Sequence, residues 1–289
     1  MSDDGEHAIV VIALLGSPFS AAYARAQHGN ATADPLSFCA LNVAVYGPRG
    51  AAWSLREREI RDEDRSIDTL RLGQSVVAWQ RGRLVIDIDE RTTPFGRPLR
   101  GRVVVHPEEP GTSRHALDPE ARHLWWPVAP LSRVEVSLSE PDLRFSGPGY
   151  HDANAGDVPL GATFRTWTWS RARLADRAVI TYDVTFRDGR TSSIALGHDR
   201  SGVTPIPDRL HRAALPRSTW GLDRTARADP GTRPRIVRSL EDGPFYARAL
   251  VGLEAFGRRG LAMHETLSAD RLDRRWVRFL AGFRTGKAA

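Results

Sequence analysis

Leu84-Val85-Ile86-Asp87-Ile88-Asp89 decides the fold class of this chain. Leu84, Ile86 and Ile88 alternate with Val85, Asp87 and Asp89 at a period of two, which is typical of a β-strand with one face on a core and the other in water. The same period recurs on both sides, and it predicts strands at Ala8–Leu15, Cys39–Val45, Arg102–His106, Val134–Leu138, Val179–Phe186 and Thr191–Leu196. The pattern therefore predicts an all-β protein of roughly ten to twenty strands.

Turns and two short helices complete the predicted elements. Asp188-Gly189 separates two strands at hairpin spacing and predicts a tight turn. A short helix is expected over Ser20–Gln27. A second is expected at the C-terminus, where Ser268 or Asp270 can cap the start of an apolar stripe at helical spacing, made of Leu272, Trp276, Leu280 and Phe283. We expect this C-terminal helix to pack across the end of a barrel.

The length of the chain predicts two β lobes. The chain has 289 residues, and one closed barrel of about eight strands would use only about half of them. Two barrel-like lobes in tandem fit the length better, with the break in the segment Pro141–Pro148. We therefore expect an N-terminal domain over residues 1–145 and a C-terminal domain over residues 146–289.

Composition and charge narrow the class of function. Hydrophobic residues make up 41% and charged residues 26%, as in ordinary globular proteins, so the chain is expected to fold. The formal net charge is +6, but the arginines are mixed with acidic residues. Because basic and aromatic residues are not interleaved as a nucleic-acid platform requires, we expect no nucleic-acid partner. The charge indicates a solvated surface, with weak attraction to anionic lipid as the alternative.

Cysteine and targeting signals indicate the compartment. Cys39 is the only cysteine, which excludes an intramolecular disulfide and indicates a buried thiol in a reducing compartment. Ile9–Leu15 is apolar like part of a signal peptide, but acidic residues precede it where a basic start is required. No stretch approaches the ~18–20 apolar residues of a membrane span.

No motif in the sequence indicates a metal or a cofactor. His264-Glu265 lacks a second histidine at ligand spacing, and Asp152–Asp157 lacks the later glutamate of a calcium loop. Phosphate-binding and dinucleotide-binding glycine motifs are also missing from the sequence. We therefore expect an enzyme without metal or cofactor, if the chain is an enzyme.

The segment Gly147–Asp157 carries the candidate chemistry. It reads Gly-Pro-Gly-Tyr-His-Asp-Ala-Asn-Ala-Gly-Asp, and we interpret it as an acidic turn. Its glycines let the backbone turn, and in an extended conformation Tyr150 and Asp152 point to the same side. Large aromatic residues flank the segment in sequence, namely Trp125, Trp126, Phe164, Trp167 and Trp169.

An acid among aromatic rings suits one type of reaction. A dry aromatic environment raises the pKa of a carboxyl group above its reference of ~3.9, so that the neutral acid can donate a proton near neutral pH. Ring faces can then stabilise the resulting cation. Together these groups favour protonation of an electron-rich alkene by Asp152. The alternative is an Asx-turn at a lobe junction, with the aromatic residues filling two cores.

Several short sequence motifs follow one another along most of the chain. They are Gly16–Ser20, Cys39–Gly47, Trp125-Trp126-Pro127, Gly149-Tyr150-x-Asp152-x-Asn154-x-Gly156-Asp157, Pro159-Leu160, Trp167–Arg171, Leu240–Arg248 and His264–Arg271. In these pieces the chain resembles the carotenoid 1,2-hydratases, also called hydroxyneurosporene synthases. Members of that family usually begin with an aromatic segment before an Asp-Asp-Gly turn, whereas this chain starts at Met1-Ser2-Asp3-Asp4-Gly5. Either the start is misassigned or the first strand of the N-terminal lobe is missing.

The resemblance implies two tandem lipocalin-like β-barrel lobes and a cofactor-independent hydro-lyase of photosynthetic bacteria. Such an enzyme hydrates the terminal C1–C2 double bond of an acyclic carotenoid such as neurosporene or lycopene. The family's acid aspartate falls on Asp152, and its important tyrosine and tryptophan fall on Tyr150 and Trp125. We expect these three residues to be catalytic and the substrate to be bound by Trp126, Trp167, Trp169, His151 and Asn154. His151 and Asp157 are candidates for orienting the water.

Two other functions stay open on the sequence alone. A terpenoid cyclase or isomerase would use the same acid but capture the cation with an internal alkene, and a lipid-binding carrier would do no chemistry. Because a polyene this apolar must be taken from lipid, we expect a cytoplasmic protein with peripheral contact to the inner photosynthetic membrane. The sequence does not indicate the oligomeric state.

Overall fold

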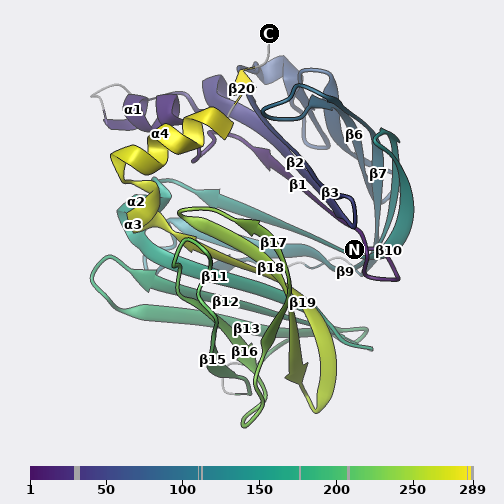
Figure 1. The fold of residues 1–289 in the computed structure, drawn as a ribbon, viewed down its shortest axis with the longest axis vertical. Helices are drawn as coiled ribbons and strands as arrows, with labels where there is room; N and C mark the ends of the chain where they lie inside the picture. The colour runs from purple at the N-terminus through teal and green to yellow at the C-terminus, as the bar shows by residue number, and fades with distance from the viewer. Residues whose placement is uncertain are drawn as a thin grey trace. The chain divides into compact units, whose positions relative to one another are not determined.

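The computed structural model describes residues 1–28, 33–109, 111, 113–175, 177–206, 209–284 and 286–287. Within these residues the chain forms twenty β-strands and a few short helices (Figure 1). The strands are arranged in four sheets with open strand orders. The prediction of an all-β protein with a short C-terminal helix is thus confirmed.

The chain divides into two compact units. Unit 1 comprises Met1–Glu108, Ser132–Tyr150 and Arg278–Ala289, and unit 2 comprises Glu109–Leu131 and His151–Val277. Strands β9 (His123–Glu140) and β10 (Asp142–Gly156) contribute residues to both units. The division between residues 145 and 146 falls inside β10 and stays a prediction.

Unit 1 contains a four-stranded sheet and most of a seven-stranded sheet. Their orders are β1-β2-β3-β20 and β10-β9-β7-β6-β5-β4, with β8 paired to β9. The strands are β1 (Ala8–Leu14), β2 (Cys39–Gly47), β3 (Gly50–Arg58), β20 (Gly286–Lys287), β4 (Thr69–Leu72), β5 (Ser75–Gln80), β6 (Arg83–Arg91) and β7 (Pro98–Glu109). The residues of β8 (His115–Ala116) belong to unit 2.

The core of unit 1 follows the alternation seen in the sequence. Leu84, Ile86 and Ile88 on β6 are buried and pack in one cluster, while Asp87 and Asp89 on the other face contact water. Apolar side chains of β2, β7 and β9 complete this cluster, which explains why every second residue of these strands is apolar.

β1 and β2 were both expected to be well buried. All residues of β2 except the last are buried, and the free cysteine at its start, Cys39, is fully enclosed as predicted. β1 forms as predicted, but most of its residues are only half-buried. It lies at the edge of its sheet, where a strand has a neighbour on one side only.

Unit 2 is built on the second seven-stranded sheet, with the order β14-β13-β12-β11-β19-β18-β17, and on the separate pair β15-β16. The strands are β11 (Phe164–Arg173), β12 (Ala178–Phe186), β13 (Thr191–Asp199), β14 (Gly202–Pro205), β15 (His211–Leu215), β16 (Arg224–Ala228), β17 (Arg235–Asp242), β18 (Tyr246–Ala255) and β19 (Arg258–Ser268). The predicted hairpin is confirmed, because β12 and β13 pair antiparallel around Asp188-Gly189, with Gly189 at a φ of 88°.

The helices are short. They are α1 (Ala21–His28), which confirms the helix expected there, the 3₁₀ turns η1 (Pro35–Phe38) and η2 (Asp62–Asp64), and α2 (Leu160–Thr163), α3 (Ala269–Leu272) and α4 (Arg275–Arg284). Among the helices of the described residues, none combines the length and apolar character that crossing a bilayer requires.

The C-terminal helical segment differs from the expected single stripe. Ser268 caps α3 as predicted, by accepting a hydrogen bond from the backbone of Arg271. The helix then ends at Leu272, and α4 begins as a separate helix at Arg275. The buried face of α4 therefore does not continue the buried face of α3. Val277 is therefore fully buried, whereas Trp276 is 46% exposed. The predicted stripe was wrong for Trp276 and Leu280, and the Phe283 side chain lies outside the described residues.

Burial of a histidine in unit 2 predicts how stability depends on pH. His264 on β19 is 1% exposed, and burial lowers its pKa to about 4, with a smaller effect from the charge of Arg224. The unfolded chain binds a proton near pH ~6.5 that the folded chain does not bind until about pH 4. Stability should therefore fall as the pH falls through this window.

Between pH 6.5 and pH 4, this histidine should make the unfolding free energy of the wild type fall by up to about 1.4 kcal/mol per pH unit. We predict that His264→Gln removes this contribution, so that its unfolding free energy depends less steeply on pH. Urea unfolding at several pH values measures this slope, whatever offset the substitution causes at neutral pH. The exposed His211→Gln is the matched control and should leave the slope unchanged. Parallel curves for wild type and His264→Gln would contradict the assignment.

Candidate functional site

One hydrogen bond joins the two main residues of the candidate site. Trp125 on β9 is 0% exposed, and its indole Nε1 donates a hydrogen bond to Oδ2 of Asp152 on the neighbouring strand β10, at 2.9 Å. An indole N–H can only donate, so this bond uses a lone pair of Oδ2. Because the donor is neutral, the bond orients the carboxyl group without pairing it with a full charge.

The segment that carries Asp152 is a strand. We interpreted Gly147–Asp157 as a turn, but the structure continues β10 to Gly156, which corrects that interpretation. The glycines serve close packing instead: a Cβ atom on Gly156 would lie 2.7 Å from Nδ1 of His123, and one on Gly147 would lie 2.0 Å from the carbonyl oxygen of Met1. In a strand, side chains two residues apart point to the same side, so the predicted common side of Tyr150 and Asp152 is retained.

Tyr182 on β12 adds a ring that the sequence interpretation missed. Its ring centroid lies 5.4 Å from that of Trp125 and 5.7 Å from that of Trp167 on β11. Burial raises the pKa of the Tyr182 hydroxyl above its ordinary value, and the carboxyl groups of Asp152 and Glu265 raise it further whenever they are ionised. The same aromatic cluster continues to Tyr246, whose ring lies 6.4 Å from that of Trp167.

Strand register explains why these groups share one face of the sheet. Trp169 on β11 stands directly opposite Tyr182 on β12 and Glu265 on β19, and directly opposed residues point to the same face. Glu265 is in turn opposite Arg248 on β18. The only signal in the sequence for Tyr182 was its place in the alternation of the predicted hairpin strand.

A buried charge cluster lies on the same face of this sheet. Arg248 is 1% exposed; its Nε donates to Glu265 at 2.8 Å, and its Nη1 lies 3.4 Å from Glu241. The guanidinium also lies 5.3 Å from the ring centroid of Tyr246. The sequence interpretation listed these residues only as part of the resemblance and gave them no role.

Two half-buried histidines, one in contact with Trp125 and one next to Asp152 in sequence, are neutral near pH 7. Burial lowers the pKa of His151 on β10 to about 4 and also lowers that of His115, whose ring lies 5.5 Å from Trp125. A neutral imidazole has one donor and one acceptor nitrogen, so it can hold a water molecule without adding charge.

The other predicted site residues are placed differently. Trp126 follows Trp125 on β9 and therefore points to the opposite face of the strand, where the guanidinium of Arg114 lies 4.9 Å from its ring centroid. Asn154 and Asp157 are exposed. Tyr150 is half-buried. It belongs to unit 1, and the chain enters unit 2 at the next residue, His151. Their roles in binding and catalysis stay predictions.

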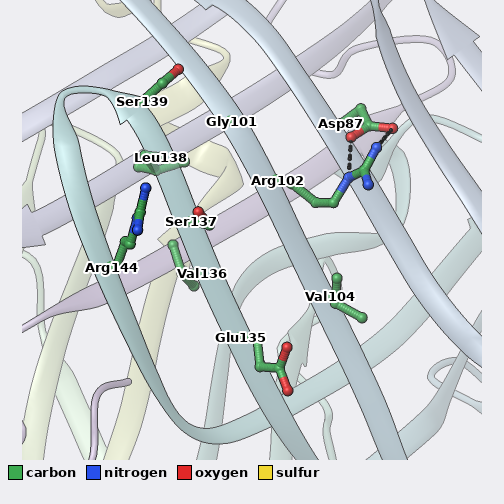
Figure 2. Close-up of a pocket in the computed structure, with 10 residues that line it drawn as sticks. All are labelled: Asp87, Gly101, Arg102, Val104, Glu135, Val136, Ser137, Leu138, Ser139 and Arg144. Atoms are coloured by element: carbon green, nitrogen blue, oxygen red, sulfur yellow. Dashed lines mark hydrogen bonds and ion pairs between the residues drawn. The ribbon is translucent and has the colours of Figure 1, made fainter.

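Two other features of unit 1 lie apart from these residues in sequence. Asp4, Glu6 and His7 have ligand atoms close enough to hold a metal ion, but the two acids are exposed. A groove of about 650 Å³ lies over β6, β7, β9 and β10, and Arg102 and Asp87 form an ion pair in it (Figure 2). Exposed charges such as Glu135 line the groove, so it does not suit an apolar ligand.

Comparison with known proteins first defines the fold class. The solved structure of a candidate AttH from Nitrosomonas europaea resembles this chain with a TM-score of 0.59 at 15% identity, over 80% of this chain and 81% of that one. This likeness concerns the fold alone.

Sequence comparison then defines the family. The family model Carotenoid hydratase CrtC matches residues 11–289. A protein of Thiocapsa roseopersicina named acyclic carotenoid 1,2-hydratase is 42% identical over 98% of this chain and 70% of its own length. A protein of Cereibacter sphaeroides with the same name is 37% identical, over 90% and 92%. The chain belongs to the carotenoid hydratase family, which confirms the resemblance seen in the sequence.

The hydrogen bond between Trp125 and Asp152 can be tested by a double-mutant cycle. We predict that Trp125→Phe and Asp152→Ala couple by about 1–2 kcal/mol in unfolding free energy, because the two side chains share a partly buried hydrogen bond to a carboxyl group. Denaturant unfolding of the two single variants and the double variant measures the coupling. The control cycle pairs Asp152→Ala with Trp126→Phe, which points away and should give a coupling near zero. Equal couplings in both cycles would contradict the bond.

Proposed function

We propose that this protein is an acyclic carotenoid 1,2-hydratase, a hydro-lyase that adds water across the terminal C1–C2 double bond of a carotenoid of the neurosporene or lycopene type. Relatives that cover most of the chain carry that name. The observation that carries the proposal is the bond from Trp125 to Asp152, which fixes a carboxyl group beside the rings of Trp125 and Tyr182.

The first step is protonation of the alkene. Asp152, protonated on Oδ1, delivers its proton to C2, the less substituted carbon of the terminal double bond. The π electrons form the new C2–H bond, and a tertiary cation remains at C1. The ring faces of Trp125 and Tyr150 stabilise this cation by roughly 1–2 kcal/mol each where water is excluded. The ring of Tyr182 contacts that of Trp125 and adds to the stabilisation of the cation.

The second step is capture by water. The oxygen of a water molecule forms a bond to C1, and the proton released from that water returns to the carboxylate of Asp152. The product is a tertiary alcohol, the acid is regenerated, and the step needs no cofactor. Trp167 and Trp169, which share the face of Tyr182, bind the polyene.

The nature of the substrate also implies where the protein works. A long polyene is held almost entirely in lipid, so a water-facing protein must meet it at a membrane surface. We infer a cytoplasmic location with peripheral membrane contact. We also infer that the two units are lipocalin-like lobes, because β folds of that kind commonly enclose an apolar ligand.

The acid assignment is tested by Asp152→Asn. This substitution keeps the shape and removes the acid, so we predict that hydration of neurosporene or lycopene falls by about 10²–10⁴-fold. The protein is incubated with carotenoid in lipid, without oxygen or added cofactor, in ¹⁸O-labelled water. Mass analysis then follows a product that is heavier than the substrate by one labelled water.

Asp188→Asn, at the exposed tip of the β12–β13 hairpin, is the matched control and should keep the wild-type rate. A wild-type rate in Asp152→Asn would rule out this residue as the acid. A product with the mass of the substrate would instead identify a cyclase or isomerase. Carotenoid binding without any conversion by the wild type would identify a carrier.

A further inference from the structure

Helix α4, coloured yellow in Figure 1, presents large apolar side chains to solvent. Phe279 is 67% exposed, Trp276 46% and Leu280 38%. Residues at positions i, i+3 and i+4 share one face of a helix, so these three side chains form a single apolar face. Val277, on a different side of the helix, is the fully buried residue. A surface helix of a water-soluble domain normally has the reverse arrangement, with its apolar face toward the core.

Trp220 extends the aromatic character of this surface within unit 2. Its ring stacks on that of Trp276 with centroids 6.3 Å apart and planes at 25°, and it is also 46% exposed. Tryptophan has an apolar ring and one polar N–H, which places it favourably at the boundary between lipid headgroups and acyl chains.

Basic residues lie at the start of α4, and the acidic residue that precedes them, Asp273, is paired with Arg187. Arg274 and Arg275 are exposed at the start of α4, and the first turn of this helix has no acidic residue. A helix N-terminus carries a partial positive charge, so arginines there do not stabilise the helix. Their position is favourable, however, beside an anionic surface. An apolar face bordered by arginines is typical of helices that lie in a membrane interface.

We infer that the exposed face of α4, formed by Trp276, Phe279 and Leu280 and bordered by Arg274 and Arg275, docks the protein on an anionic phospholipid surface. This inference deepens the proposed function, because it identifies the surface through which the protein reaches a lipid-dissolved substrate. The apolar side chains insert among the acyl chains, and the arginines contact the headgroup phosphates.

Binding of the full chain to vesicles tests the inference without any substrate. We expect the wild type to co-sediment with vesicles of phosphatidylcholine and phosphatidylglycerol, and less with phosphatidylcholine alone. Phe279→Asp should lower the partition coefficient by about 10–100-fold, the equivalent of one buried Phe side chain. Leu280→Asp is a second variant with the same expected direction. Arg275→Gln should lower binding by about 5-fold, and only on the anionic vesicles.

The matched control is Phe95→Asp. Phe95 is 78% exposed in the turn between β6 and β7, so the same substitution at a similarly exposed position should leave vesicle binding unchanged. Equal binding by the wild type, Phe279→Asp and Leu280→Asp would overturn the inference. So would dissociation of a dimer by Phe279→Asp in sedimentation velocity without a change in vesicle binding, because the face would then belong to a contact between two copies.

A parallel assay separates this inference from the proposed function. With carotenoid supplied in detergent micelles, Phe279→Asp should hydrate at the wild-type rate, whereas with carotenoid in vesicles it should be slower in proportion to its lost binding. A wild type that binds vesicles through α4 but hydrates no carotenoid in either medium would refute the proposed activity and leave the docking surface supported. Equal rates of the two proteins on vesicles would overturn the docking role.

Discussion

The hydrogen bond from the indole of Trp125 to the carboxyl group of Asp152 is the interaction on which the candidate site depends. It connects two neighbouring strands, so the acid is held by sheet backbone and a fully buried side chain rather than by a loop. Groups on regular elements keep their positions more closely than groups on loops. The bond fixes the carboxyl group at the edge of the Trp125 ring, within the aromatic cluster that Trp125 forms with Tyr182 and Trp167.

Strand register then decides which residues join this pair. In unit 2, Trp167 and Trp169 point to the face that holds Tyr182, while Thr168 and Ser170 point to the other face. That second face is also buried, and an ion pair between Asp183 of β12 and Arg227 of β16 at 2.7 Å links it to the β15–β16 pair. Because the side-chain period is two, a slip by one residue would exchange the tryptophans for small polar side chains.

The sequence predicted some of this arrangement well. Alternation alone was sufficient for the strand around Ile86 and for the hairpin at Asp188-Gly189, because both depend on local pattern. The resemblance selected Trp125 and Asp152, but not the bond between them. Tyr182 could not be predicted as a site residue, since its ring reaches Trp125 only through packing between strands of two different sheets.

Two sequence interpretations failed for physical reasons that a pattern does not contain. The glycines before and after Asp152 suggested a turn, yet the structure uses Gly156 to let the backbone pass close to the ring of His123. The C-terminal stripe assumed one continuous helix, and the break at Asp273-Arg274 rotated the residues that follow it. In both cases the deciding contact or break involves tertiary packing rather than local preference.

The buried guanidinium of Arg248 has a consequence for the fate of a reactive cation. A free carboxylate next to a carbocation is itself a nucleophile and could alkylate to a dead-end ester. Glu265 and Glu241 flank Arg248, and their hydrogen bonds and ion pairing to it make their oxygens poorer electron donors. Their negative field can still favour a positive charge nearby.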